Sequence, residues 1–361
     1  MKTYNLENVA WLGLDLHAHH SVLGWVDRSG ERRGHWRFAT NEREIVRHIK
    51  LVPVAIKQLV MEECCQARWA AQIARPHTSE VVVCDPHYNR QISHHHNKCD
   101  EEDVYGLALA HRMGAIKVVW QPTSDERAIF KTATQGYLAA VERQSAIKKQ
   151  IKAQYRQWGV VPTGSAVYSV SGRESWLKKI EPLAIRSQLN LVYEMLDGAL
   201  EGESKSRRLM IHAGKAFPEI KRLQTMPGVG AIGAHVFVAF VQDPVRFQTP
   251  QQLFHYSRLG ICDRSSDGKP LGYQRLDGRG HGELKAMSYR AWLTAMKHKT
   301  GPLHEFYEQS LERTHDKVHA RLNTLRKVLR TLAVMWEEQK DFDADKFLGR
   351  AAKSTTKATC S

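Results

Sequence analysis

Four acidic residues stand where an expected strand ends or a helix begins, and their side chains suit metal-assisted chemistry. Asp15 closes the apolar run VAWLGLDL, Glu62 follows a second apolar segment, and Asp100 and Asp103 open a helix. The i, i+3 spacing of the last two puts both side chains on one helical face. Gathered carboxylates repel one another unless a cation lies between them, and Mg²⁺ prefers oxygen ligands. We therefore expect these four acids to bind one or two Mg²⁺ ions, which can hold the attacking and leaving oxygens of a phosphodiester in line.

A purely structural role, without metal binding, must be considered for each of these acids. Asp15 is hard to explain as a surface residue because it lies within an apolar strand. Glu62 has Glu63 beside it, and strand alternation allows only one of the two to face the site. Asp100 and Asp103 could simply stabilise the positive end of a helix dipole. The hypothesis depends on all four acids occurring together.

Histidine and cysteine offer weaker alternatives. A zinc site is conceivable at a set of loop histidines, namely His17, His19, His20 and 94–96. Zinc ligands usually show defined spacings and Cys or acid partners, so contacts to phosphates fit these histidines better. The six cysteines form no CxxC pair and indicate reduced thiols in a protein that stays inside the cell.

The first third of the chain predicts alternating strands and helices. Strands are expected at 9–16, 21–26, 34–38, 55–61 and 80–84, with helices from Asn41, across 67–73 and from near Asp100. Asn41 is a good N-cap, with Glu44 completing a capping-box pattern. The order β-β-β-α-β-α-β-α is that of the RNase H fold and predicts a mixed sheet with helices on its faces.

The remainder of the chain predicts mainly helices. Two apolar stripes at helical spacing are Ile147, Ile151, Tyr155, Trp158 and Ile185, Leu189, Val192, Leu196, Ala199. Joined through 159–175, they predict an antiparallel pair or coiled coil, either an ordinary helical subdomain or an oligomerisation arm. Later come an apolar helix through Phe240, a Gly-rich polar loop at 264–282, a helix near 284–298 and a final stripe. That stripe consists of Val318, Leu322, Leu325, Leu329 and Leu332.

The charge of the chain favours a polyanionic partner. Lys and Arg outnumber Asp and Glu by 53 to 38, which gives a net charge of +15. Each cation set against a phosphate releases counterions, so nucleic acid is the natural partner, although solubility alone is the plain alternative. No apolar stretch reaches the roughly 20 residues of a membrane helix and no signal peptide is recognisable, so we expect a cytoplasmic, nucleoid-associated protein without a membrane partner.

Several residues suit contacts with phosphates. Pro227-Gly228-Val229-Gly230 precedes a helix and could present backbone N–H groups to a phosphate, although a plain helix–helix connection fits equally well. The expected nucleic-acid-binding residues are Gly228, Gly230, Arg275, Arg279, Lys148, Lys149, Arg326 and Lys327. The last two belong to a basic final helix that we expect to carry Arg313, Lys317, Arg321, Arg326, Lys327 and Arg330. Their plain alternative is solvated charge.

Three short motifs carry a family resemblance. Gly13-Leu14-Asp15, Val60-Met61-Glu62 and the run from Lys98 to Asp103 (KCDEED) resemble the DEDD motif of the insertion sequence 110 transposases, relatives of the Piv invertase. The resemblance continues at 227–230 and 265–268, so it covers most of the chain. It implies a RuvC-like, RNase H-like domain, a coiled-coil linker, a mainly helical C-terminal transposase domain with a nucleophilic serine, tetrameric assembly, and recombination guided by a structured non-coding bridge RNA.

The serine motif departs from the family pattern. The family serine usually precedes glycine directly, whereas Asp267 intervenes here, so Ser265 and Ser266 are both open as the nucleophile; we favour Ser266. A serine needs a base to share its proton, and Asp267 and His281 are the candidates. Without the resemblance, the segment would be interpreted as a turn.

Together these observations predict an α/β protein of three parts and a tail. The expected parts are a catalytic domain at 1–121, a helical linker at 122–220, a serine-bearing domain at 221–340 and a flexible tail at 341–361. The expected function is a Mg²⁺-dependent DNA transposase or recombinase that acts as a dimer or tetramer on donor and target DNA with a guide RNA. The alternatives are a Holliday-junction-type or RNase H-like nuclease, which would need no serine, and a non-catalytic nucleic-acid scaffold.

Overall fold

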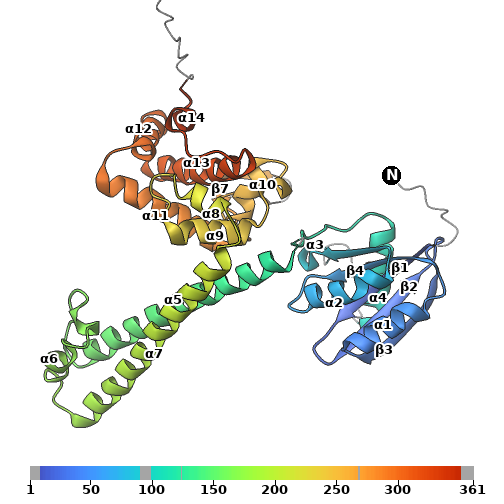
Figure 1. Ribbon diagram of the computed structural model, residues 1–361, viewed down its shortest axis with the longest axis horizontal. Coiled ribbons are helices and arrows are strands. Elements are labelled where there is room, and N and C mark those ends of the chain that lie inside the picture. Colours follow the sequence, from blue (N-terminus) through green and yellow to red (C-terminus); the bar gives the residue numbers. More distant parts are fainter. Residues whose placement is uncertain (1–8, 90–98, 123, 267–268, 351–361) are drawn as a thin grey trace, which may run out of the picture. The chain divides into compact units, whose positions relative to one another are not determined.

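A computed structural model describes residues 9–89, 99–122, 124–266 and 269–350 of the chain (Figure 1). The chain divides into two compact units, Met1–Gln121 and Pro122–Ser361. The first is a mixed α/β unit, and the second is mostly helical, as the sequence predicts. No helix among the described residues is both long and apolar enough to cross a lipid bilayer.

The first unit is built on a five-stranded mixed sheet in the order β3-β2-β1-β4-β5. Its strands are β1 (Val9–Leu16), β2 (His20–Val26), β3 (Arg32–Ala39), β4 (Ile56–Glu62) and β5 (Glu80–Cys84). The pairs β1–β2 and β2–β3 are antiparallel, whereas β1–β4 and β4–β5 are parallel. The helices are α1 (Glu42–Leu51), α2 (Ala67–Ala74), the 3₁₀ turn η2 (Arg75–His77), α3 (Pro86–Asn89) and α4 (Asp100–Arg112). Asn41 caps α1 as predicted, because its side chain accepts a hydrogen bond from the Glu44 N–H.

Side-chain alternation divides the sheet into two covered faces. Leu12 and Leu14 of β1 and Leu59 and Met61 of β4 belong to one buried cluster with residues of α1 and α2. The residues between them face the other way, where α4 packs. Val60, for example, shares a buried cluster with Leu107 of α4.

The second unit begins with a long helical hairpin of α5 (Asp125–Gln157) and α7 (Leu183–Gly214), which lie side by side in Figure 1. The connection contains the 3₁₀ turn η3 (Ala166–Tyr168) and α6 (Arg173–Leu177). Ile151 and Tyr155 of α5 pack on Leu189, Val192 and Leu196 of α7, as the two stripes predict. Trp158 is an exception: it caps the end of α5 and is exposed, because the helix stops before another turn could bury it.

The C-terminal part of this unit surrounds an apolar helix, α9 (Ala231–Val241), that is buried along most of its length. Around it lie α8 (Glu219–Leu223), η4 (Pro244–Arg246), α10 (Pro250–Tyr256), α11 (Gly282–His298), α12 (Pro302–Thr314), α13 (Lys317–Glu337) and α14 (Ala344–Leu348). A two-stranded sheet of β6 (Ile261–Ser266) and β7 (Lys269–Leu276) stands between α10 and α11 in the sequence.

Three expectations for this part need correction. The segment expected as a polar loop at 264–282 forms most of the β6–β7 hairpin and the start of α11. Arg313 belongs to α12 and not to the final basic helix, because the chain reverses direction in an αL residue at His315. The expected tail from residue 341 still contains α14, whose Phe347 is buried against the core, so only its last part, 351–361, lies outside the described residues.

Candidate functional site

The ends of β1 and β4 bring two of the expected acids to one edge of the sheet. The parallel register pairs Gly13 with Val60 and Leu14 with Met61, so Asp15 and Glu62 follow at the same level on neighbouring strands. Because alternate side chains share a face, both point to the α4 side, unlike Leu14 and Met61. The N-terminus of α4, which carries the other two acids, covers that side.

Asp15, His17 and Asp100 form a compact cluster. One potential ligand atom from each of the three lies within 4.8 Å of the others, a spacing that a metal ion could bridge. The Nε2 of His17 lies 3.0 Å from Oδ2 of Asp15. Burial raises the pKa of Asp15; His17 opposes this shift, while the charges of Asp100 and Asp103 add to it. A cation at this edge would relieve the repulsion among the carboxylates.

The four acidic residues at the start of α4 have different partners. Glu102 forms a bidentate ion pair with Arg32 of β3 at 2.6 and 2.7 Å. Glu101 lies 3.2 Å from Nδ1 of His35. These pairs fix α4 on the sheet and leave Asp100 and Asp103 on the side of Asp15, although Asp100 also lies 3.6 Å from Arg37.

Glu62 and Glu63 differ in their surroundings. The exposed Glu63 accepts a hydrogen bond of 2.7 Å from the side-chain amide of Gln121, and its backbone N–H donates to Cys84. Glu62, by the alternation above, lies on the α4 face. Neither Glu62 nor the exposed Asp103 is a member of the compact cluster, which Asp15 and Asp100 form with His17.

His17 is the residue that the sequence did not assign to this site. The histidines were weighed together as a zinc hypothesis, whereas the structure places His17 alone against Asp15. His19 and His20 are exposed, and 94–96 lie outside the described residues. The available signal was its position: His17 follows Asp15 by two residues, which is the strand period.

The expected nucleophile lies on the β6–β7 hairpin. Ser265 and Ser266 end β6, and their backbones pair with Pro270 and Lys269 of β7. The register shifts between Asp263 and Ser265, which marks a β-bulge just before the serines. Asp267 and Gly268 lie outside the described residues, as do the side chains of both serines.

The base of this hairpin carries a second polar cluster. The Nδ1 of His255 lies 3.0 Å from Oδ2 of Asp277, while Oδ1 accepts hydrogen bonds from the backbone N–H and Nε of Arg279. Burial pushes the pKa of Asp277 upward, but the hydrogen bonds from Arg279 and His255 outweigh it and lower the pKa to about 2. His281, the other expected base, packs on Phe240 and Tyr256, and burial lowers its pKa to about 4.

Most expected phosphate-binding cations have partners within the protein. Arg326 donates through Nε to the carbonyl of Leu259, and Lys327 lies over the rings of Phe306 and Phe347. Burial lowers the pKa of both cations, so this part of the final helix packs inward. Arg279 is held by Asp277, and Lys148 lies over the ring of Tyr168. Lys149 and Arg275 are exposed.

The glycines of the 227–230 turn play unequal parts. Gly228 has a φ of 81°, and a Cβ there would stand 2.7 Å from the carbonyl oxygen of Ala291. Gly228 is therefore needed for close packing on α11, which favours the helix–helix connection for that residue. Gly230 is the N-cap of α9 and borders open space.

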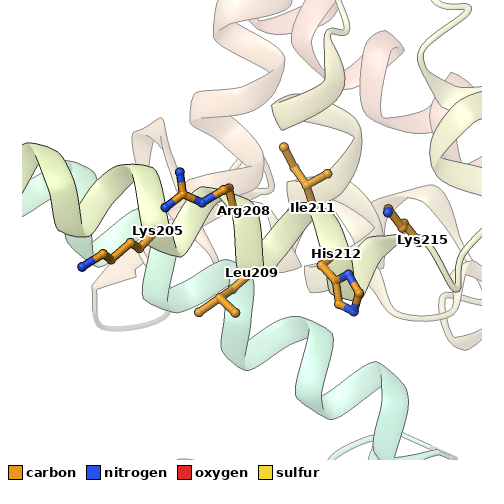
Figure 2. A pocket seen from close by; sticks show the side chains of 6 residues that line it. All are labelled: Lys205, Arg208, Leu209, Ile211, His212 and Lys215. Carbon is orange, nitrogen blue, oxygen red and sulfur yellow. The ribbon is translucent and has the colours of Figure 1, made fainter.

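A basic hollow that the sequence analysis missed lies along the end of α7 (Figure 2). It has a volume of about 610 Å³ and is lined by Lys205, Arg208, Leu209, Ile211, His212 and Lys215. The signal was present in the sequence, because basic side chains at 205, 208, 212 and 215 recur at the helical period.

The comparisons with known proteins concern the second unit. The first unit is mixed α/β and carries clustered carboxylates, and the second unit is helical and basic. Together these features define the chain as a candidate nucleic-acid-processing protein. Residues 220–308, which include α9 and the whole β6–β7 hairpin, match the family model described as transposase IS116/IS110/IS902 family. This match supports the resemblance to the insertion sequence 110 transposases that the motifs indicated. The acids of the first unit lie outside the matched residues, and no curated protein matches the chain.

Proposed function

We propose that this transposase cuts and rejoins DNA with Mg²⁺ held by Asp15, Glu62, Asp100 and Asp103 and with a serine of the β6–β7 hairpin as nucleophile. The observation that carries the proposal is the convergence of Asp15 and Asp100 at one sheet edge, with the pKa of Asp15 raised by burial and by neighbouring carboxylates. The order of strands and helices supports an RNase H-like assignment for the first unit.

The residues at the acidic edge fit a divalent metal ion. The donor set is dominated by carboxylate oxygens, which suit Mg²⁺, and repulsion among them disfavours the site when it holds no cation. Bound there, Mg²⁺ would neutralise charge on a DNA phosphate and stabilise the leaving oxygen. His17 would orient Asp15 through its contact with Oδ2.

The proposed reaction of the serine is a phosphoryl transfer. The serine oxygen bonds to phosphorus, the bond from phosphorus to one DNA strand breaks, and the serine proton passes to a base while the leaving oxygen is protonated. A hydroxyl of another strand then attacks the phosphoserine and releases the serine. Of the two candidate serines, Ser265 and Ser266, we assign the role of nucleophile to Ser266.

The partners follow from charge and from the family. The net charge of +15, the exposed Lys149 and Arg275 and the basic hollow on α7 support binding to DNA and to a structured guide RNA. Leu191 and Met195 are more than half exposed one turn apart on α7, which supports assembly into a dimer or tetramer through the helical hairpin.

The test of the acidic site is metal-dependent cleavage of DNA by the full chain with its RNA. Asp15→Asn keeps the shape of the side chain but removes its charge, so cleavage should be lost while RNA binding and the circular dichroism spectrum are retained. Asp27→Asn is a matched control, because Asp27 is held by Ser29 and Arg33 away from this edge. Full cleavage by Asp15→Asn would overturn the proposed site.

A further inference from the structure

His255, Cys262 and Asp277 form a group that the recombination mechanism does not use. One potential ligand atom from each lies within 4.8 Å of the others, and all three residues are partly buried. His255 belongs to α10, Cys262 to β6, and Asp277 directly follows β7. Three separate segments thus meet at the base of the serine-bearing hairpin.

We propose that His255, Cys262 and Asp277 bind a Zn²⁺ ion that fastens the base of the β6–β7 hairpin to α10. One imidazole nitrogen, one thiolate and one carboxylate oxygen are the three ligand types that zinc accepts in proteins. Around a tetrahedral zinc ion, such atoms stand about 3.3–3.6 Å apart, so separations that now lie within 4.8 Å must change by at most about 1.5 Å. Mg²⁺ is a poor fit because it avoids sulfur and nitrogen ligands.

The surroundings hold the ligands in place before any metal binds. Asp277 donates its backbone N–H to the carbonyl of Gly260 at 2.9 Å, and Gly260 donates to the carbonyl of Phe254 at 2.8 Å. A Cβ on Gly260 would stand 2.4 Å from Nδ1 of His255, so glycine is needed there for the imidazole to approach. Cys262 pairs with Arg275 across the hairpin, which fixes its place on the strand.

The carboxylate of Asp277 is also oriented by a neighbour. Its Oδ1 accepts hydrogen bonds from Arg279 at 2.9 and 3.2 Å, and its Oδ2 is directed to His255. A carboxylate fixed in this way through one oxygen presents the other to a metal. Three protein ligands leave the fourth position of zinc to a water molecule or a substrate oxygen.

The site differs from the acidic edge of the first unit in one measurable property, its thiolate. Co²⁺ replaces Zn²⁺ in such sites and gives a ligand-to-metal charge-transfer absorption only when a thiolate is bound. The full chain, freed of metal with a chelator, should be titrated with Co²⁺ in a large excess of Mg²⁺, which keeps the oxygen-rich edge occupied. We expect one equivalent to produce the thiolate absorption and Zn²⁺ to abolish it by displacement.

Variants identify the ligands. Cys262→Ser should abolish the thiolate absorption, whereas His255→Gln and Asp277→Asn should weaken Co²⁺ binding at least tenfold while leaving the circular dichroism spectrum unchanged. Cys99→Ser is the matched control, because Cys99 precedes Asp100 at the acidic edge and should not affect the signal. Cys262→His should restore Zn²⁺ binding without the absorption, which separates loss of a ligand from loss of the fold.

Two results would overturn the proposal. One is a titration without thiolate absorption in the wild-type chain; the other is an absorption that survives Cys262→Ser or disappears with Cys99→Ser. Either result leaves the proposed DNA chemistry untouched, because the readout is metal binding and requires no DNA. Conversely, failure of Asp15→Asn to impair cleavage would leave the zinc site standing.

Discussion

Gly13 of β1 lies directly beneath the carbonyl of Val104 in α4: a Cβ on Gly13 would stand 2.0 Å from that oxygen. This close approach lets α4 pack tightly on the sheet. Gly13 precedes Asp15 by two residues, and Val104 follows Asp100 by one helical turn. The absence of a side chain at Gly13 therefore sets the distance between the two acids of the cluster.

Replacing Gly13 with alanine should destabilise the first unit by about 3 kcal/mol or more, because a backbone oxygen cannot move aside as a side chain can. Urea denaturation followed by circular dichroism measures the change. Gly106→Ala is the matched control on the same helix, since nothing lies within 4 Å of a Cβ there. That variant should be neutral or stabilise the protein by up to about 1 kcal/mol. Equal stability of the two variants would contradict the packing described for Gly13.

Glu62→Gln should impair catalysis strongly, whereas Glu63→Gln should affect it little. Glu62 lies on the α4 face with Asp15, so its neutralisation should lower metal-dependent cleavage of DNA by about two orders of magnitude. Glu63 is bound to Gln121, and a glutamine can keep that hydrogen bond, so cleavage should change less than about threefold. Cleavage rates at saturating Mg²⁺ separate the variants. A larger loss in Glu63→Gln would mean that the register at the end of β4 is assigned to the wrong residue.

Burial of His281 should make the second unit sensitive to mild acid. Its pKa is lowered to about 4, chiefly by burial, with Lys131, Arg246 and Arg258 acting in the same direction and Glu283 against it. Below a pH of about 6.5, the ordinary pKa of histidine, His281 binds a proton in the unfolded chain but stays neutral in the folded chain. Its contribution to the free energy of unfolding is therefore complete above pH 6.5 and decreases as the pH falls towards 4. The loss should be about 2 kcal/mol after allowance for partial exposure.

The measurement is the urea midpoint of the second unit's transition between pH 7 and pH 4.5. In His281→Gln, which cannot take up a proton, the acid-dependent part of the loss should shrink by that amount. Identical pH profiles for wild type and His281→Gln would contradict the assignment.

The exposed pair Leu191 and Met195 gives a test of assembly. Leu191→Glu combined with Met195→Glu should reduce the mass measured by light scattering, because charge would be buried in an apolar interface. Val170→Glu, at a residue that is more exposed than either and lies outside α7, should not change the mass. A monomeric wild-type chain, with and without nucleic acid, would instead favour an ordinary helical subdomain.

The sequence predicted the parts of the fold in which apolar spacing is regular. The run from Val9 to Leu16 gave β1, and the stripes around Ile151 and Leu189 gave the helical hairpin, because burial imposes the period directly. The β6–β7 hairpin was missed because Asp263 to Ser266 is polar throughout and shows no alternation. Its signal was the Asp267-Gly268 pair, a favoured two-residue hairpin turn.

Within the candidate site, the positions of the acidic residues in the fold were more predictable than the contacts that their side chains make. Asp15, Glu62 and Asp100 lie at element ends as predicted, whereas the contact of His17 with Asp15 depends on the local path of the chain after β1. Charge alone was misleading at Arg326 and Lys327, whose stems and head groups pack against the protein. A basic stripe does not reveal which of its members faces solvent.

Trapping a protein–DNA adduct tests the central claim most directly. A stalled reaction of the full chain with its RNA and DNA substrates should leave the protein on a DNA end through a phosphoserine bond, which mass spectrometry of the digested adduct locates. Ser266→Ala should lose the adduct and all strand exchange yet retain nucleic-acid binding, whereas Ser265→Ala should retain both activities. Loss in Ser265→Ala alone would move the assignment by one residue. Normal recombination by the double variant, or metal-dependent cleavage that never yields an adduct, would contradict the serine mechanism and indicate a nuclease that uses water.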